Sequence, residues 1–252
     1  GTDVIGRART GMGKTLAFVL PLCELLNDAG IGETKKQGRG PIGVILAPTR
    51  ELAVQIVKEV ESVTKGYKVL ALYGGTPYPP QFQALRNGVD VVVGTPGRLK
   101  DHLEKGTLDL VARCKFAVLD EADQMLDMGF AEDMEIILGA CTNPERQTCL
   151  FSATMPAWVK STAAKYMKNP QTIDVVGNNA VKASTDVRHI AIPAHWTTRA
   201  GTISDTISMY AGATGRVIIF CETKAECNDL SIDDGLKYEA KALHGDVPQV
   251  SE

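Results

Sequence analysis

Short apolar runs alternate with longer amphipathic segments over residues 1–177, and this alternation constrains the fold more than any other feature. The apolar, β-rich runs lie at residues 4–6, 43–47, 68–73, 89–93, 116–119, 148–151 and 172–175. Segments with helical periodicity lie between most of them, at residues 14–28, 50–64, 78–86, 97–104, 131–140 and 157–167. Strands that alternate with helices form a parallel sheet with helices on both faces. Near-continuous apolar strands are typical of such doubly covered sheets. The sequence therefore predicts an α/β domain over residues 1–177.

A polar stretch at residues 178–186 has no apolar periodicity and is interpreted as a linker. The alternation starts again over residues 187–252, where it predicts strands at 188–192, 216–221 and 240–243 and helices at 198–211 and 224–231. So short a segment leaves a sheet little core to close, and we interpret it as the truncated beginning of a second α/β domain. The chain starts at Gly1 rather than Met, which favours a fragment of a longer protein.

The composition, 44% hydrophobic and 23% charged, is that of a globular protein. No apolar run approaches the roughly 18 residues that a transmembrane helix needs. The net charge of −3 provides no overall attraction for nucleic acid, so such binding must come from local groups in a groove. The six cysteines form no Cys-x-x-Cys pair and the four histidines are scattered. This argues against a metal site built from His and Cys and favours reduced thiols inside a cell.

A glycine-rich octapeptide lies between a predicted strand and a predicted helix, which is the setting of a phosphate-binding loop. The residues expected around the phosphates are Ala8, Arg9, Thr10, Gly11, Met12, Gly13, Lys14 and Thr15. Glycines let backbone N–H groups turn toward phosphate oxygens, and the helix N-terminus adds partial positive charge. Lys14 can reach the β- and γ-phosphates, and the Thr15 hydroxyl can bind Mg²⁺. The alternative is a glycine-rich turn without a ligand, because the strict pattern has Gly in place of Ala8; the flanking elements disfavour it.

The apolar run that ends at Leu119 is followed by the sequence Asp-Glu-Ala-Asp. Ligands of open α/β sheets bind at the carboxyl ends of strands, so we expect these carboxylates beside the phosphate loop. Asp120 is predicted to hold Mg²⁺ through water, and Glu121 to orient and deprotonate an attacking water. Together with Lys14 they form the predicted catalytic set. A solvated helix N-terminus is the alternative, since acidic residues favour that position.

These two segments together resemble motifs I and II of the DEAD-box RNA helicases, and further segments similar to family motifs follow in order. They are Pro-Thr-Arg-Glu-Leu at 48–52, Gly-Gly at 74–75, Thr-Pro-Gly-Arg at 95–98, Ser-Ala-Thr at 152–154, Val-Ile-Ile-Phe-Cys-Glu-Thr at 217–223, and Leu-His-Gly-Asp at 243–246 with Gln249. The resemblance covers nearly the whole chain. It implies the RecA-like fold of P-loop NTPases, with a parallel sheet between helices, and the start of a second RecA-like domain.

The resemblance implies an enzyme that binds ATP, Mg²⁺ and single-stranded RNA, and that uses ATP hydrolysis to separate RNA duplexes or remodel RNA–protein complexes. The residues then expected along the RNA backbone are Pro48, Thr49, Arg50, Gly75, Thr95, Pro96, Gly97 and Arg98. Arginine pairs bidentately with phosphate and glycine permits close approach of amides, so binding should not depend on base sequence. The residues expected to couple the ATP site to domain closure are Asp123, Ser152, Ala153 and Thr154, with Ser152 and Thr154 hydrogen-bonded to Asp123.

The resemblance also implies groups that this sequence lacks. A glutamine that reads adenine would precede Gly1, and the arginines that act on the γ-phosphate would follow Glu252. The fragment alone is therefore not expected to hydrolyse ATP under RNA control or to unwind RNA. Phe220 ends an apolar run and is expected in a core rather than stacked on RNA.

Within the family, several stretches are similar to the nucleolar Gu-type subgroup, also called nucleolar RNA helicase II. These are residues 73–78, 97–102, 123–130, 195–200 and 215–224. The similarity implies ribosomal RNA processing, ribonucleoprotein partners and a nuclear or nucleolar location, with no membrane association. A plastid branch of the subgroup leaves plastid and cytoplasm open, and the sequence does not indicate an oligomeric state.

Two other functions fit part of the pattern. A P-loop GTPase or small kinase is disfavoured because the sequence has no guanine-reading Asn-Lys-x-Asp segment and does have the segments at 48–52 and 152–154. An ATP-gated RNA clamp or assembly scaffold with little unwinding would use the same motifs as a helicase. The sequence leaves that alternative open.

Overall fold

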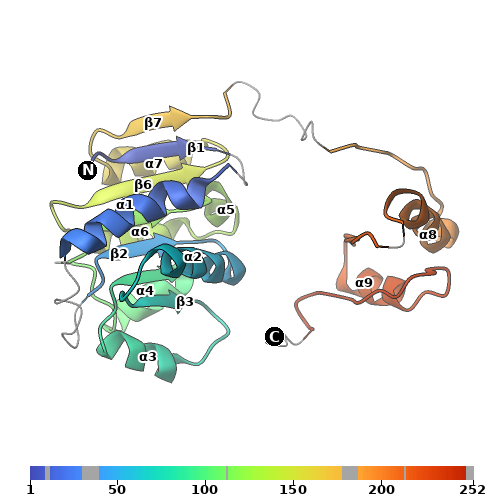
Figure 1. The fold of residues 1–252 in the computed structure, drawn as a ribbon, viewed down its shortest axis with the longest axis horizontal. Helices are drawn as coiled ribbons and strands as arrows, with labels where there is room; N and C mark the ends of the chain where they lie inside the picture. The colour runs from blue at the N-terminus through green and yellow to red at the C-terminus, as the bar shows by residue number, and fades with distance from the viewer. Residues whose placement is uncertain (9–11, 30–39, 112, 178–186, 213, 248–252) are drawn as a thin grey trace. The chain divides into compact units, whose positions relative to one another are not determined.

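A computed structural model describes residues 1–8, 12–29, 40–111, 113–177, 187–212 and 214–247 (Figure 1). The chain divides into two compact units, Gly1–Lys182 and Ala183–Glu252, each of which is described by itself. The predicted linker at 178–186 lies outside the described residues.

The first unit contains one seven-stranded parallel sheet within the described residues, with strand order β3-β4-β2-β5-β6-β1-β7. The strands are β1 (Val4–Arg7), β2 (Gly43–Leu46), β3 (Val69–Leu72), β4 (Val91–Gly94), β5 (Phe116–Leu119), β6 (Gln147–Ser152) and β7 (Gln171–Asp174). They lie close to the predicted apolar runs, and the predicted α/β class with a RecA-like parallel sheet is confirmed. A parallel arrangement brings the carboxyl ends of all strands to one edge of the sheet, which is where ligands bind in such folds.

Helices cover both faces of this sheet, and Figure 1 shows α1 and α2 in front of it with α6 and α7 behind. The helices are α1 (Lys14–Ala29), α2 (Arg50–Val63), α3 (Tyr78–Arg86), α4 (Pro96–Glu104), α5 (Ala122–Asp127), α6 (Ala131–Ala140) and α7 (Ala157–Tyr166). The short helix α5 was not among the predicted helices. It contains too few apolar positions to show a helical period.

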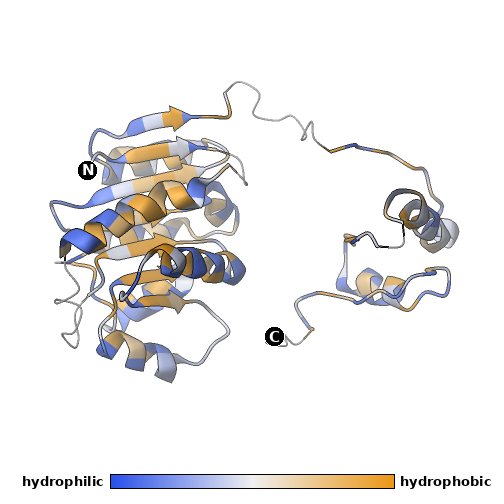
Figure 2. Ribbon diagram, viewed as in Figure 1, coloured by the Kyte–Doolittle hydropathy of each residue, from blue (hydrophilic) through white to orange (hydrophobic). Residues whose placement is uncertain are grey.

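Two separate hydrophobic cores result from the alternation of side chains along the strands. In β5, Phe116 and Val118 point toward α1 and α2, and Ala117 and Leu119 pack on the opposite face with α4 to α7. Since successive strand residues face opposite sides, a strand covered on both faces must be apolar throughout. The hydropathy colouring shows this in the central strands, which are almost entirely hydrophobic (Figure 2).

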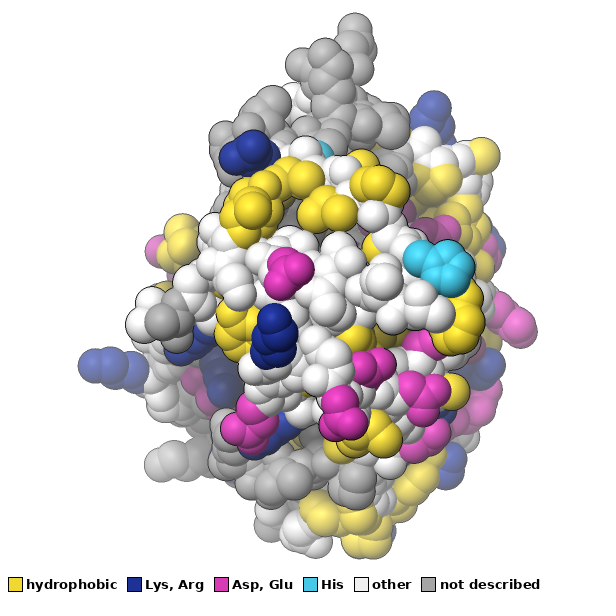
Figure 3. Space-filling view, turned by 90° about the vertical axis from the view of Figure 1, so that its right-hand side faces the viewer, with side chains coloured by type: hydrophobic (Ala, Val, Ile, Leu, Met, Phe, Trp, Pro, Cys, Tyr) yellow, Lys and Arg dark blue, Asp and Glu magenta, His cyan; other side chains and the backbone are white. Residues whose placement is uncertain are grey.

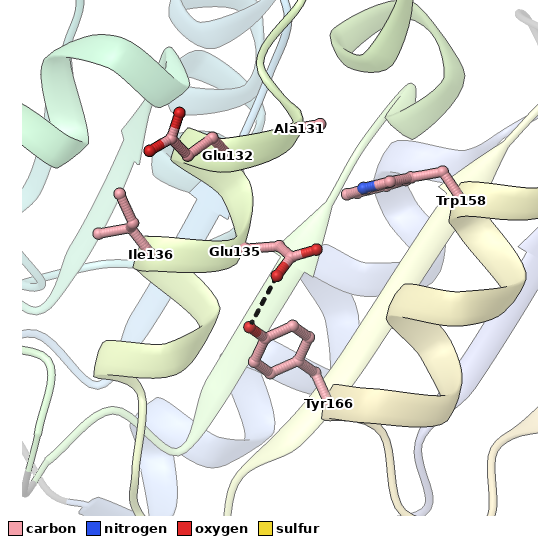
Figure 4. Close-up of a pocket in the computed structure, with 6 residues that line it drawn as sticks. All are labelled: Ala131, Glu132, Glu135, Ile136, Trp158 and Tyr166. Atoms are coloured by element: carbon pink, nitrogen blue, oxygen red, sulfur yellow. Dashed lines mark hydrogen bonds between the residues drawn. The ribbon is translucent and has the colours of Figure 1, made fainter.

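Helices α6 and α7 lie side by side and leave a shallow groove of about 540 Å³ between them (Figure 4). Its lining combines carboxylates and aromatic rings: Ala131, Glu132, Glu135, Ile136, Trp158 and Tyr166. The Tyr166 hydroxyl donates to Glu135 at 3.4 Å, and Lys165 forms an ion pair with the same carboxylate at 2.6 Å. These contacts link the two helices, and none of the predicted site residues lines this groove.

The second unit contains the short 3₁₀ helix η2 (Trp196–Thr198) and the helices α8 (Arg199–Tyr210) and α9 (Lys224–Ser231). Both α-helices were predicted, but the strands predicted at 188–192, 216–221 and 240–243 were wrong, because the structure has no strand at these described positions. Apolar composition alone does not make a strand; backbone groups must also find partners in a neighbouring strand. These three segments form no such ladder.

The predicted core position of Phe220 was also wrong, for the same reason. Without a sheet to cover it, the Phe220 side chain is 92% exposed, and Ile218 and Leu243 are exposed as well. Hydrophobic side chains are visible at the surface in the space-filling view (Figure 3). No helix in the described parts of the chain has both the length and the apolar character needed to cross a membrane.

Candidate active site at the carboxyl edge of the sheet

The predicted site residues follow the carboxyl ends of six strands, and the strand order sorts them into two groups. The loops after β1, β5 and β6 carry the predicted phosphate, catalytic and coupling residues, and these three strands are neighbours. The loops after β2, β3 and β4 carry the predicted RNA residues, and these strands are also neighbours. We call the first group the nucleotide half of the edge and the second the RNA half. Because β2 pairs with β5, the two halves adjoin.

Lys14 begins helix α1 and is buried, with its Nζ 4.0 Å from Oδ1 of Asp120. Gly13, just before it, has φ of 78°, a left-handed conformation that favours glycine, and a Cβ added there would meet no atom within 4 Å. The start of α1 also offers backbone N–H groups that have no partner inside the helix. A buried cation at the N-terminus of a helix suits a phosphate group. Arg9, Thr10 and Gly11 lie outside the described residues.

Asp120 follows β5 directly and is only 2% exposed. Burial raises the pKa of its carboxyl to about 6, and the nearby Lys14 ammonium acts in the opposite direction. The backbone N–H of Glu121 donates to its Oδ1 at 3.0 Å. Burial makes the negative charge of a carboxylate unfavourable, and a cation bound beside it stabilises that charge. With the half-buried hydroxyl of Thr15 in the same loop–helix junction, Asp120 supplies the oxygen ligands that Mg²⁺ prefers, so these residues fit that ion.

Glu121 has a left-handed backbone, with φ of 53° and ψ of 51°. For a residue other than glycine this conformation costs about 1–3 kcal/mol, and such strain is concentrated at functional sites. Glu121 stands at the N-terminus of α5, but its side chain makes no capping hydrogen bond to that helix. The acidic residues do stand at a helix N-terminus, as the alternative expects, but Glu121 does not cap that helix with its side chain. The strained backbone turns the chain sharply between the buried Asp120 and the start of α5.

Thr154 is bonded to Asp123 across the nucleotide half. The backbone N–H and the hydroxyl of Thr154 both donate to Oδ2 of Asp123, at 2.8 and 2.9 Å. The predicted bond from Ser152 to Asp123 is wrong, because the buried Ser152 hydroxyl donates instead to the carbonyl of Thr154 at 2.6 Å. Ser152 is still the last residue of β6, and its side chain lies against the turn of its own segment. Ala153 contributes its carbonyl, which accepts from Nε of Arg7 at 3.4 Å.

In the RNA half, Arg50 and Gly75 lie next to each other. A Cβ added to Gly75, whose φ is 81°, would lie 3.6 Å from a guanidinium nitrogen of Arg50. The Arg50 guanidinium also stands 5.7 Å from the centre of the Tyr73 ring and is partly exposed.

Thr49 caps helix α2, since its hydroxyl accepts from the backbone N–H of Leu52 at 3.2 Å. Pro48, just before it, is buried.

Arg98 is less exposed than the sequence pattern suggested, at 9%. Its Nη1 donates to the carbonyl of Thr76 and to Oε1 of Gln81, both at 3.0 Å, and its guanidinium stacks 4.1 Å from the Tyr78 ring centre. Nearby, Thr95 immediately precedes α4 and makes no side-chain capping bond, and Pro96 is in the first turn of α4. A Cβ added to Gly97 would lie 3.6 Å from Asp133.

Gln81 and His102 were missed by the sequence analysis, although both are buried behind the RNA half. A signal was present: each is a polar residue on the inward face of a predicted helix, three or four positions from an apolar residue that packs in the core. Such residues need internal hydrogen-bond partners, and the sequence does not say where these partners lie.

Comparison with known proteins agrees with this geometry. Residues 1–162 match the family described as DEAD/DEAH box helicase. The chain is 50% identical over 254 residues to Nucleolar RNA helicase 2 of Rattus norvegicus, covering 99% of this chain and 32% of that protein. It is 49% identical over 255 residues to DEAD-box ATP-dependent RNA helicase 7 of Arabidopsis thaliana, covering 99% of this chain and 37% of that protein.

Among solved structures, a DEAD box protein from the hyperthermophile Methanococcus jannaschii matches with a TM-score of 0.61 and 36% identity, covering 98% of this chain and 63% of that one. The chain spans about a third of the length of the curated relatives named above. The family match, these identities and the shared fold lead to one conclusion. The chain belongs to the DEAD/DEAH box helicase family.

Proposed function

We propose that this chain belongs to an RNA-stimulated ATP hydrolase that locally separates RNA duplexes or remodels RNA–protein complexes. Residues 1–177 would form its ATP-binding RecA-like domain, residues 187–252 would belong to a second RecA-like domain, and residues 178–186 would link the two. The observation that carries this proposal is the common edge, on which Lys14, Asp120 and Glu121 adjoin the loops after β2, β3 and β4.

ATP would bind with its phosphates over the start of α1. The loop that would surround them comprises Ala8, Arg9, Thr10, Gly11, Met12, Gly13, Lys14 and Thr15. Lys14 would neutralise phosphate charge as a buried ammonium, a position that makes its interaction stronger than at the surface. Mg²⁺ would lie near Asp120 and Thr15 and supply positive charge to the phosphates. Asp120 would hold the Mg²⁺ ion through water. The pKa of Asp120 is raised by burial, so a nearby positive charge would stabilise its ionised form.

Hydrolysis would depend on Glu121. It directly follows the buried Asp120, at a strained turn where its side chain makes no capping bond to α5. A carboxylate in this place can orient a water molecule and accept its proton as the water attacks phosphorus. Asp120 and Glu121 would thus divide two roles, cation binding and proton transfer.

The bond between Thr154 and Asp123 supports a coupling role for the loop after β6. Asp123 lies three residues beyond Asp120, and Thr154 follows the strand next to β5. A movement of the Ser152–Thr154 segment would therefore shift Asp123 and, with it, the neighbouring residues Asp120 and Glu121. We propose that closure of the second domain acts on this segment, which includes Ala153.

RNA would bind across the loops after β2, β3 and β4, through its phosphates and sugars. The proposed contacts are Pro48, Thr49, Arg50, Gly75, Thr95, Pro96, Gly97 and Arg98. The Arg50 side chain is partly exposed beside Gly75, and its Nε lies 3.5 Å from the Glu51 carboxylate. Such contacts fix the strand without reading its bases, so binding would be independent of sequence.

The relatives suggest where the protein works. One of them is named as a nucleolar RNA helicase. We propose by this similarity that the protein acts in the nucleolus, in ribosomal RNA processing, with ribonucleoprotein partners. The relative from Arabidopsis thaliana carries no location in its name.

The test is ATP hydrolysis by the full-length protein with and without single-stranded RNA, together with displacement of a short RNA strand. We expect hydrolysis to rise with RNA of any sequence and a strand to be released only with ATP. Retention of RNA in the presence of ATP without strand release would assign the clamp function instead. Hydrolysis that is indifferent to RNA would contradict the proposal.

A further inference from the structure

A buried polar cluster lies directly behind the RNA half of the edge, and Gln81 of α3 is at its centre. The Gln81 side chain is 7% exposed. Its Nε2 donates to the Thr76 hydroxyl at 2.7 Å and to the carbonyl of Tyr73 at 3.5 Å. Its Oε1 accepts from Arg98 at 3.0 Å and faces Nε2 of His102 at 2.8 Å. One amide thus uses both of its N–H groups and both lone pairs of its oxygen.

The orientation of this amide follows from the chemistry of its neighbours. A guanidinium only donates hydrogen bonds, so the Gln81 atom that faces Arg98 must be the oxygen. The same oxygen faces Nε2 of His102, so that nitrogen must carry the proton. Nδ1 of His102 is then an acceptor, and the Thr107 hydroxyl lies 2.8 Å from it. When His102 is neutral, its proton is therefore on Nε2.

His102 is held in this neutral form by its surroundings. It is fully buried, and burial is the main cause that lowers its pKa to about 4. Arg98 and Lys105 lower the pKa further, and Asp101 opposes them weakly. From α3, the Tyr78 and Phe82 rings pack against the imidazole and bring no further charge. The hydrogen bond from His102 to Gln81 therefore persists across the physiological pH range.

The cluster reinforces the link between two loops that Arg98 already joins through its bond to the Thr76 carbonyl. Tyr73 and Thr76 flank the two glycines after β3, and Arg98 comes from the segment after β4. Gln81 binds both loops, so it fixes the distance between the Gly75 amide and the Arg98 guanidinium. Preorganised contacts bind a ligand more tightly because less ordering is needed on binding.

We propose that Gln81, oriented by His102, is a positioning residue for RNA that sets the spacing of the contacts after β3 and β4. This inference rests on the proposed RNA function of the edge. Neither Gln81 nor His102 is exposed enough to meet RNA itself, so each acts through Arg98 and the glycine loop. The ATP site lies in the other half of the edge and does not depend on the cluster.

The experiment measures RNA affinity and ATP affinity of the full-length protein carrying Gln81→Met, which keeps the side-chain length but removes all four hydrogen bonds. We expect RNA affinity to fall about tenfold, because the contacts after β3 and β4 are no longer preorganised, with ATP affinity unchanged. The matched control is Gln83→Met, because Gln83 is exposed two positions further along α3 and bonds to Asn87 of the same segment. It should bind RNA like the wild type.

Variants of His102 separate positioning from general stability. His102→Gln places an amide N–H where Nε2 now donates, and His102→Leu removes the donor. We expect His102→Gln to keep most of the RNA affinity and His102→Leu to match Gln81→Met, measured at a temperature where melting curves show each variant folded. Equal RNA affinities of the two His102 variants would overturn the inference. Failure of the wild type to bind RNA at all would instead contradict the proposed function.

Discussion

Thr154 donates two hydrogen bonds to a single carboxylate oxygen of Asp123, one from its backbone at 2.8 Å and one from its hydroxyl at 2.9 Å. Asp123 follows β5 and Thr154 follows the neighbouring strand β6, so their bond links the segments after these two strands. Hydrogen bonds to a charged group contribute about 1.5–3 kcal/mol, more than neutral ones. The link is therefore strong enough to transmit a conformational change between the two loops.

Replacing Thr154 by Val should uncouple ATP hydrolysis from RNA. Val keeps the volume and the backbone bond but removes the hydroxyl bond to Asp123. We expect RNA stimulation of ATP hydrolysis to fall by about tenfold, because a bond to a charged group is lost, while ATP affinity stays unchanged. Ser161→Ala is the control, since its exposed hydroxyl bonds only within α7. Full RNA stimulation in Thr154→Val would remove this bond from the coupling pathway.

Replacing Lys14 by Ala should weaken ATP binding. The substitution removes a buried ammonium from the start of α1, so we expect affinity to fall by tenfold or more, equivalent to about 1.5–3 kcal/mol for a charge-assisted contact. Calorimetric titration with ATP measures this, and Lys160→Ala, which removes an exposed charge from α7, is the control. An unchanged affinity would rule out Lys14 as the phosphate ligand.

The two arginines of the RNA half should respond differently to substitution. Arg50 is partly exposed, so Arg50→Ala should leave the melting temperature intact, weaken RNA binding equally for all sequences, and reduce the slope of log K against log salt by about 0.7, one phosphate contact. Lys58→Ala, the same charge change on an exposed position of α2, should leave the slope unchanged. A loss confined to certain RNA sequences would contradict backbone recognition.

Arg98→Ala should lower both RNA affinity and the melting temperature. The Arg98 guanidinium is buried and donates to Thr76 and Gln81, so its removal takes a donor from the half-buried Thr76 carbonyl and one of two donors from Gln81, at a cost of about 1–3 kcal/mol. Thermal unfolding beside an RNA titration measures the two effects. A normal melting temperature would show that the internal bonds of Arg98 contribute nothing to stability.

Stability should depend on pH through His102. Its pKa in the folded protein is about 4, below the ordinary value of 6.5, so the unfolded chain binds more protons between these values. The contribution of His102 to the free energy of unfolding should be complete above pH 6.5. The free energy of unfolding should then decrease by up to about 3 kcal/mol as the pH falls to 4. His102→Gln should flatten this decrease, and His189→Gln, at an exposed position, should not. Denaturant unfolding at several pH values measures it, and identical slopes for both variants would refute the assignment.

The first unit was predictable because its determinants are local. The apolar run from Phe116 to Leu119 favours a strand covered on both faces, and the glycine-rich sequence before Lys14 favours a turn into a helix. What was not predictable depends on partners far away in the sequence. The burial of Arg98 depends on Thr76 and Gln81, and the sequence pattern does not show that the Ser152 hydroxyl bonds to the Thr154 carbonyl. In the second unit, the apolar run that ends at Phe220 has the composition of a strand. It does not form one, because no described strand lies beside it to pair with.

The most direct test of the whole account is Glu121→Gln in the full-length protein. Gln keeps the shape of Glu121 but cannot accept the proton of the attacking water. We predict that the variant binds ATP and single-stranded RNA like the wild type, holds both in a long-lived complex, and hydrolyses ATP at a rate lower by roughly 10²-fold or more. Glu132→Gln, the same change at an exposed position of α6, should hydrolyse ATP normally. Normal RNA-stimulated hydrolysis by Glu121→Gln would contradict the account, because the carboxyl edge would then lack the base assigned to it.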